Sequence, residues 1–144
     1  MKALVTGTSR GIGRAIARAL LAESAAVALA VRDPASVADL VAPAGRSAVA
    51  VPIDLRDAQA LTGLVPRAIA ALGGLDVLVN CAGIVHYRAL PDVSRAELVE
   101  QLEVNFVAPF MLSQAAAAHM GDRGGGVILN VASTLGLRPA PPSA

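Results

Sequence analysis

The chain has 144 residues, a length that suits one domain. Hydrophobic residues make up 55% of it, charged residues 16% and aromatic residues only 2%, so small and aliphatic side chains have to form the core. The net charge of +1, with no run of basic residues, gives no electrostatic reason to expect a nucleic-acid partner.

The cysteine content and the apolar stretches indicate the compartment. The single cysteine, Cys81, excludes an intramolecular disulfide and fits a reducing environment. No apolar stretch approaches the roughly 18 residues that a membrane span needs. Thr6, Gly7 and Arg10 interrupt the apolar start before the apolar region of a signal peptide could develop. We therefore expect a cytoplasmic protein without a membrane partner, and we assign no metal site.

Apolar runs and helical patterns alternate along the chain. The expected strands are residues 2–6, 26–31, 49–53, 75–80 and 127–131. The expected helices are residues 11–21, 34–40, 57–72 and a long one from 94 towards 120. Continuous apolar strands separated by helices predict a parallel sheet covered on both faces, which is a Rossmann-like, doubly wound α/β fold in one domain over residues 1–144.

Some local signals are specific. Ser94 followed by Glu97 is typical of a capping box, and Gly73 is a typical helix stop. Pro66 falls inside the helix expected over 57–72 and predicts a kink or a restart there. The proline-rich segment 138–144 is expected to be a loop.

The first strand leads through a glycine-rich loop into the first helix. Gly7 permits a tight exit from the strand, Gly11 lets the backbone approach a pyrophosphate, and Gly13 lets the helix pack on the sheet. Free N–H groups at the helix start attract an anion. Arg14 stands where a nucleoside triphosphatase loop would carry lysine. The pattern predicts dinucleotide binding, with a merely flexible glycine turn as the alternative.

These residues resemble a known family. Residues 6–13, Thr-Gly-Thr-Ser-Arg-Gly-Ile-Gly, are similar to the Thr-Gly-x-x-x-Gly-x-Gly cofactor loop of the short-chain dehydrogenase/reductase family. Residues 80–83 resemble its Asn-Asn-Ala-Gly segment with cysteine at the second position, Asn105 stands at its helix asparagine, and Ser133 at its catalytic serine. The resemblance implies that the cofactor contacts Gly7, Ser9, Arg10, Gly11, Ile12, Gly13, Asn80, Ala82 and Gly83.

Two arginines bear on the choice of nicotinamide cofactor. An NAD-preferring protein would be expected to place an acidic residue at the end of the second strand, where Val31 stands. Arg32 and Arg10 could instead bind a ribose 2′-phosphate through forked hydrogen bonds. We expect a preference for NADP(H) with NAD(H) possible; the alternative is that both are solvated surface charges. Asp54 is expected to bind the adenine or, alternatively, to cap the following helix.

The resemblance also implies a reaction. In the family a serine holds the substrate carbonyl, a tyrosine acts as the general acid, a lysine lowers the pKa of that tyrosine, and the helix asparagine supports a proton relay. Ser133 and Asn105 are the matching catalytic candidates. The alternative is that Ser133 only ends a strand and that Asn105 only caps or kinks a helix.

The tyrosine and the lysine have no match. The Tyr-x-x-x-Lys pattern would begin about a dozen residues after Ser133, past Ala144. Tyr87 is followed four residues later by Pro91, and the only lysine is Lys2. We therefore expect a fragment that is inactive alone and marginally stable, with residues 127–131 as an unprotected, association-prone sheet edge.

Two classes of function remain. The first is an oxidoreductase that interconverts a small-molecule carbonyl and alcohol, similar to 3-oxoacyl-carrier-protein reductases, whose full-length parent is expected to be a homo-oligomer. The alternative is a non-catalytic module that binds or senses a dinucleotide. A different nucleotide-like ligand, such as a methyl donor, would leave Asn105 and Ser133 without a use. His86, Tyr87 and Arg88 are either pocket-lining residues or a solvated loop.

Overall fold

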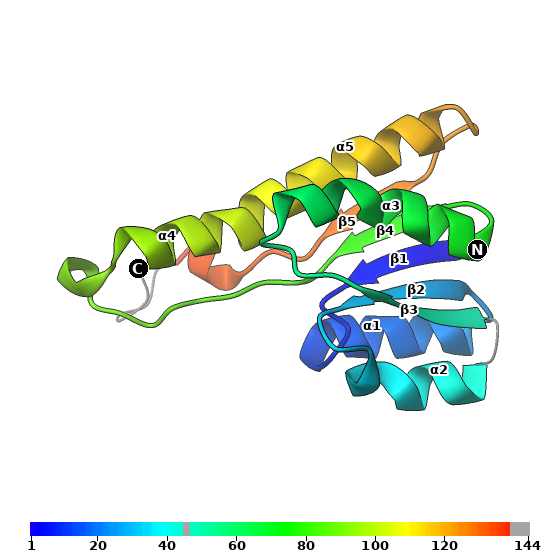
Figure 1. Cartoon of the computed structure of the whole chain (residues 1–144), viewed down its shortest axis with the longest axis horizontal. Coiled ribbons are helices and arrows are strands. Elements are labelled where there is room, and N and C mark those ends of the chain that lie inside the picture. Colours follow the sequence, from blue (N-terminus) through cyan, green and yellow to red (C-terminus); the bar gives the residue numbers. More distant parts are fainter. Residues whose placement is uncertain (45–46, 139–144) are drawn as a thin grey trace.

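A five-stranded sheet forms the centre of the molecule in a computed structural model that describes residues 1–44 and 47–138 (Figure 1). All strand pairs are parallel and the order is β3-β2-β1-β4-β5. The strands are β1 Lys2–Thr6, β2 Ala26–Val31, β3 Ala48–Pro52, β4 Val77–Asn80 and β5 Val127–Asn130. The order reverses between β1 and β4, and ligands of doubly wound sheets bind at the carboxyl ends of the strands beside such a reversal.

Helices cover both faces of the sheet, as Figure 1 shows. One face carries α1 Gly11–Ala22 and α2 Ala38–Ala44, which follows the 3-10 turn η1 Pro34–Val37. The other carries α3 Ala58–Leu72 and a long helical rod made of α4 Arg95–Leu102, the π-helical turn η4 Glu103–Val107 and α5 Ala108–Gly121. Two further 3-10 turns are η3 Leu90–Asp92 and η5 Thr134–Gly136.

Each face of the sheet has its own apolar core. One core contains Leu4, Leu64, Leu78 and Leu112 between the sheet and helices α3 and α5. The other contains Val5, Val27, Leu29 and Leu40 on the side of α1 and α2. Strands β1 and β2 contribute to both cores, which is why their sequences are apolar without interruption.

The expected doubly wound α/β fold is confirmed, and so are most of its local signals. Ser94 and Glu97 form the reciprocal capping box, and Gly73 ends α3 with a positive φ of 73°. The helix expected over 34–40 is instead a 3-10 turn followed by a helix that extends to Ala44. The long helix expected from 94 is interrupted in its hydrogen bonding by the π turn η4.

The restart expected at Pro66 is wrong, while the alternative, a kink, stays a prediction. Helix α3 runs through it, and Pro66 itself is exposed. The missing N–H of a proline removes one helical hydrogen bond. Leu61, Leu64 and Val65 are buried against the sheet, and this packing holds the helix together.

The exposed edge of the sheet and the length of the helices describe the surface of residues 1–44 and 47–138. Strand β5 lies at one edge of the sheet, with Val127 56% and Leu129 46% exposed. None of the helices in the described ranges is both long enough and apolar enough to cross a membrane. Of the loop expected over 138–144, residues 139–144 lie outside the described part.

Candidate active site

The glycine-rich loop lies where β1 passes into α1. Gly7 and Gly11 have φ angles of 73° and 59°, in the left-handed region that glycine tolerates best. Arg10 precedes α1 and its side chain makes no capping hydrogen bond. The first N–H groups of α1 therefore remain available to an anion, which the helix dipole also attracts.

Steric crowding explains two glycines of the loop. A Cβ at Gly13 would overlap the carbonyl oxygen of Gly7 and lie 3.0 Å from the carbonyl oxygen of Thr6. A Cβ at Gly7 would lie 2.8 Å from Cα of Ala82. The loop, α1 and the segment after β4 are therefore packed backbone against backbone, which leaves a cradle that side chains would fill.

Thr6 holds the loop and the segment after β4 together. Its buried hydroxyl accepts hydrogen bonds from the backbone N–H groups of Cys81, at 3.0 Å, and Ala82, at 3.1 Å. This structural role was not assigned from the sequence, although Thr6 is the first residue of the cofactor-loop pattern. A hydroxyl at the end of a strand gave no local signal of a partner 75 residues away.

A groove of about 1440 Å³ runs along the carboxyl ends of the strands. Every residue assigned from the sequence to the cofactor or to catalysis lines it. These residues are Gly7, Ser9, Arg10, Gly11, Ile12, Gly13, Arg32, Asp54, Asn80, Ala82, Gly83, Asn105 and Ser133. The tertiary structure therefore brings together residues from six separate segments of the chain, while their individual roles stay predictions.

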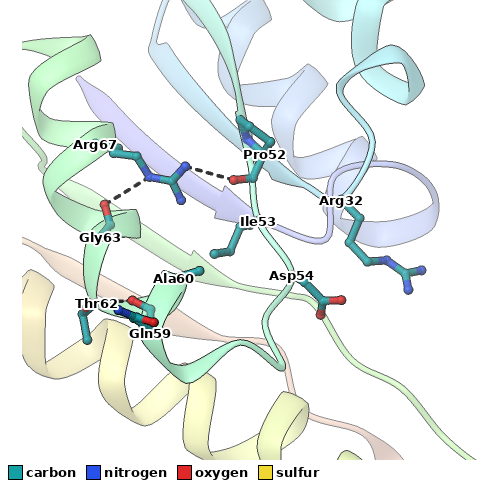
Figure 2. Close-up of a pocket in the computed structure, with 9 residues that line it drawn as sticks. All are labelled: Arg32, Pro52, Ile53, Asp54, Gln59, Ala60, Thr62, Gly63 and Arg67. Atoms are coloured by element: carbon teal, nitrogen blue, oxygen red, sulfur yellow. Dashed lines mark hydrogen bonds between the residues drawn. The ribbon is translucent and has the colours of Figure 1, made fainter.

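One end of the groove carries Arg32 and Asp54. Figure 2 shows Arg32, after β2, and Asp54, after β3, with their side chains extending into the same open space. They also line a smaller hollow of about 630 Å³, whose far side is Arg67 bound to the carbonyl oxygens of Gly63 and Pro52 (Figure 2). The smaller hollow contains none of the glycine-loop residues.

Asp54 does not cap helix α3. Asp57 does so, by accepting from the N–H groups of Gln59 and Ala60, so the alternative helix-capping role for Asp54 is wrong. The hydrogen bonds from Arg56 are the main reason why the pKa of Asp54 falls to about 2, and the charge of Arg32 adds to the effect. Asp54 is therefore an ionised, acceptor-only group at neutral pH.

Asn105 lies in the π turn η4. Its side-chain oxygen accepts from the N–H of Ile84 at 2.9 Å, and its nitrogen donates to the carbonyl of the same residue at 2.8 Å. The amide thus holds the segment after Gly83 against the helical rod. Such π turns within α-helices occur frequently at functional sites.

Ser133 lies just beyond β5, on the wall of the groove. Its hydroxyl oxygen accepts from the N–H of Leu135 at 3.2 Å and caps the turn η5. A serine hydroxyl that accepts one hydrogen bond keeps its own proton for donation. The geometry therefore leaves Ser133 able to donate to an oxygen atom of a molecule in the groove.

Asn80 is almost fully buried, with 4% exposure. Its side-chain nitrogen lies 2.9 Å from Oδ1 of Asn130 and 3.1 Å from Oγ of Ser113. These contacts tie β4 to β5 and α5. Ser113 and Asn130 also line the groove and were not proposed from the sequence, because their proximity depends on how the helix packs on the sheet.

The remaining titratable candidates differ in whether they line the groove or are paired elsewhere. Tyr87 lines the groove and is 62% exposed. His86 and Arg88 are instead paired with Glu100 and Glu97 of α4. Lys2 donates to the carbonyl of Gly73 near the amino end of β1. The groove lies at the carboxyl ends of the strands, so Lys2 does not approach Tyr87.

A glycine-rich loop at the reversal of a parallel sheet, with polar side chains at the strand ends, defines a nucleotide-binding site of the Rossmann type. The family model for short chain dehydrogenases matches residues 1–144, and the chain belongs to this family. This is a family of oxidoreductases, and one relative, 36% identical over 138 residues, is an L-rhamnose 1-dehydrogenase (NAD(P)(+)) of Azotobacter vinelandii.

Individual relatives agree with this assignment. An uncharacterized oxidoreductase of Methylorubrum extorquens is 38% identical over 137 residues, which are 92% of this chain and 54% of the relative. The ketoacyl reductase HetN of Nostoc is 38% identical over 136 residues, 92% of this chain and 47% of the relative. The chain therefore spans about half the length of these relatives.

The crystal structure of a short-chain type dehydrogenase/reductase from Mycobacterium marinum superimposes with a TM-score of 0.90 at 35% identity. The match covers 99% of this chain and 59% of that structure. The fold of the described residues is thus shared with a solved member of the family.

Proposed function

We propose that this chain supplies the cofactor site of an NADP(H)-dependent oxidoreductase that interconverts a small-molecule carbonyl and alcohol. The observation that carries the proposal is that Arg10, in the glycine loop, and Arg32, after β2, both line the same groove. The end of β2 offers Val31, whose side chain cannot accept a hydrogen bond from a ribose hydroxyl. A doubly negative 2′-phosphate is the group that two guanidinium ions bind best.

The residues present fit such a cofactor. The backbone cradle at Gly7 and Gly13 leaves room for a pyrophosphate, and the start of α1 offers it N–H groups. Asp54 can accept from the amino group of an adenine. When bound, the nicotinamide supplies or accepts the hydride.

The residues of this chain would act on the substrate side of the groove. Ser133 donates a hydrogen bond from its hydroxyl group to the substrate oxygen and so polarises the carbonyl. Asn105 orients the segment after Gly83, and its π turn shapes the adjoining wall. The proton that completes the reduction needs a general acid, which the family resemblance places in a Tyr-x-x-x-Lys pair.

That pair is absent from the 144 residues, because Tyr87 has Pro91 four residues later and Lys2 lies at the amino end of β1, away from the groove. We therefore expect the 144-residue chain by itself to show no carbonyl reduction. The groove and its backbone cradle account for binding alone, so a module that binds or senses a dinucleotide without turnover is a second candidate function. The intact mass of the native protein, together with assays of NADPH binding and turnover, separates the two.

The cofactor preference is tested by binding. The protein expressed from its complete reading frame should bind NADPH more tightly than NADH in a fluorescence or calorimetric titration. Arg10→Gln and Arg32→Gln should each weaken NADPH binding by roughly 10- to 100-fold, since a hydrogen bond to a charged group contributes about 1.5–3 kcal/mol, and should leave NADH binding unchanged. Arg18→Gln is the control, because Arg18 pairs with Asp39 away from the groove. Equal or tighter binding of NADH by the unmodified protein would refute the arginine argument.

A further inference from the structure

A chain of charged side chains crosses one wall of the groove. Arg56 grips both oxygens of Asp54, with Nε 2.9 Å from Oδ1 and Nη2 2.5 Å from Oδ2. The third nitrogen of the same guanidinium lies 2.9 Å from Oε1 of Glu100, and Oε2 of Glu100 lies 2.9 Å from Nε2 of His86. The chain thus connects the end of β3 to α4 and to the segment after β4.

These groups belong to the wall of the groove itself. Asp54, Arg56 and Glu100 line it, and so does Gln101, whose side-chain oxygen accepts from the N–H of His86. The connection therefore runs from Asp54, at the end of the groove proposed for the adenine (the adenine end), to helix α4, which leads into the π turn of Asn105.

Global stability does not explain this arrangement. The side chains of Arg56, Asp54 and Glu100 are 47%, 38% and 32% exposed, and ion pairs in such surroundings contribute little to folding. Their geometric effect is larger, because a guanidinium that holds both carboxylate oxygens fixes the plane of the carboxylate. The backbone N–H of Arg56 also donates to Oδ1 of Asp54, at 3.0 Å, and restricts that side chain further.

An ionised carboxylate in a fixed orientation discriminates between bases. It can only accept hydrogen bonds, so it favours a purine whose 6-position carries an amino donor over one that carries an oxo acceptor. The hydrogen bonds from Arg56 keep the pKa of Asp54 low, which maintains this acceptor-only state over the pH range in which the protein would be assayed.

We propose that Arg56 is a positioning residue that orients Asp54 for a 6-amino purine. Through Glu100, Arg56 also couples the adenine end of the groove, at Asp54, to helix α4, so that the two move as one unit. The inference rests on the proposed function, because it assumes that a dinucleotide occupies the groove. It goes beyond that function by assigning base selectivity, and the link to α4, to a residue that does not itself need to touch the ligand.

The test compares two cofactors that differ only at position 6 of the purine. The dissociation constants of NADPH and of its hypoxanthine analogue are measured for the protein from its complete reading frame. We expect the unmodified protein to favour NADPH by about 10-fold or more, the effect of one hydrogen bond to a charged group. Arg56→Gln should reduce that ratio at least about threefold, and Arg56→Lys, which keeps the charge without the fork, should retain part of it.

Two further variants isolate the link to α4. Glu100→Gln should leave the base ratio within about twofold, because Arg56 still holds Asp54. It should, however, speed amide hydrogen exchange of residues 84–101 in the NADPH complex. Arg88→Gln is the matched control: Arg88 joins the same segment to α4 through Glu97 but is not connected to Asp54, so it should change neither the ratio nor the protection of residues 98–101.

The outcomes distinguish this inference from the proposed function. An unmodified protein that binds neither cofactor would overturn the proposed function and this inference with it. An unmodified protein that binds NADPH, together with an Arg56→Gln variant that keeps the full base ratio, would overturn the inference alone. If Arg56→Gln does not fold, an Arg56→Lys variant that keeps the full base ratio, together with a Glu100→Gln variant whose amide exchange is unchanged, would also reject it.

Discussion

Replacing Gly13 by alanine tests whether the packing of α1 on the glycine loop determines the cofactor cradle. The added Cβ would overlap the carbonyl oxygen of Gly7 and lie 2.9 Å from the carbonyl carbon of the same residue, where ordinary contacts begin at 3.4 Å. The loop or the helix must therefore retreat by at least roughly half an ångström, and every atom in the way belongs to the backbone.

The expected cost follows from that geometry. Overpacking costs about 1–3 kcal/mol, and backbone neighbours that cannot rotate away place Gly13→Ala at the upper end. Gly63→Ala is the matched control, since Gly63 also lies in a helix and its added Cβ would meet only Nε of Arg67, at 3.9 Å. That change should stabilise the protein by about 1 kcal/mol, through helix propensity alone.

The assay is thermal or urea unfolding of the two variants side by side. After the helix-propensity gain is deducted from Gly13→Ala, the variants should differ by about 3 kcal/mol, which corresponds to roughly 6–12 °C in Tm for a domain of this size. Gly13→Ala should also lose NADPH affinity while Gly63→Ala keeps it. A Gly13→Ala variant within about 0.5 kcal/mol of the unmodified protein would refute the reasoning, because the loop would then yield without cost.

Three other predictions concern hydrogen bonds in the described residues. Thr6→Val should destabilise the protein by about 2–3 kcal/mol in urea unfolding, because two buried N–H groups lose their acceptor, whereas Thr6→Ser should be nearly neutral; equal losses would disprove the hydroxyl's role. Arg14→Gln should weaken NADPH binding roughly tenfold, whereas Arg18→Gln should not. Both arginines pair with Asp39, but only Arg14 also donates to the carbonyls of Ser9 and Ser36. Indistinguishable NADPH titrations of the two variants would contradict this. Hydrogen bonds from the backbone and hydroxyl of Ser94 lower the pKa of Glu97 from 4.5 to about 2, so its stabilising effect is present above pH 4.5 and disappears as the pH falls towards 2. Glu97→Gln should therefore be less stable than the unmodified protein at pH 7 and equally stable near pH 2, and a difference independent of pH would exclude this linkage.

The local order of the elements could be read from the residues. The apolar runs, the glycine loop and the Ser94 capping box each depend on neighbours within a few positions, so their outcomes agree with the expectations. Pro66 shows the limit of such reasoning: the helix does not end and restart there, because its burial against the sheet outweighs the local effect of the proline.

The arrangement of the site was only partly accessible in the same way. The motif residues meet because the strands of a parallel sheet have their carboxyl ends on one side of the sheet. The π turn at Asn105 gave no signal, since it depends on the contact between that side chain and the backbone of Ile84, 21 residues earlier. The contacts of Asn80 with Ser113 and Asn130 were equally hidden, because they join residues 33 and 50 positions apart.

The sequence by itself determined the fold class, the glycine loop and part of the set of residues that face the groove, because these follow from periodicity, from the conformational freedom of glycine and from a motif order shared with a family. Only the tertiary structure decided what each polar group is paired with. It made Asp57 rather than Asp54 the cap of α3, and it placed Arg56 between Asp54 and Glu100. The physical reason is that a hydrogen bond or an ion pair depends on distances of about 3 Å between atoms, and for residues far apart in the chain those distances exist only after the helices have packed on the sheet.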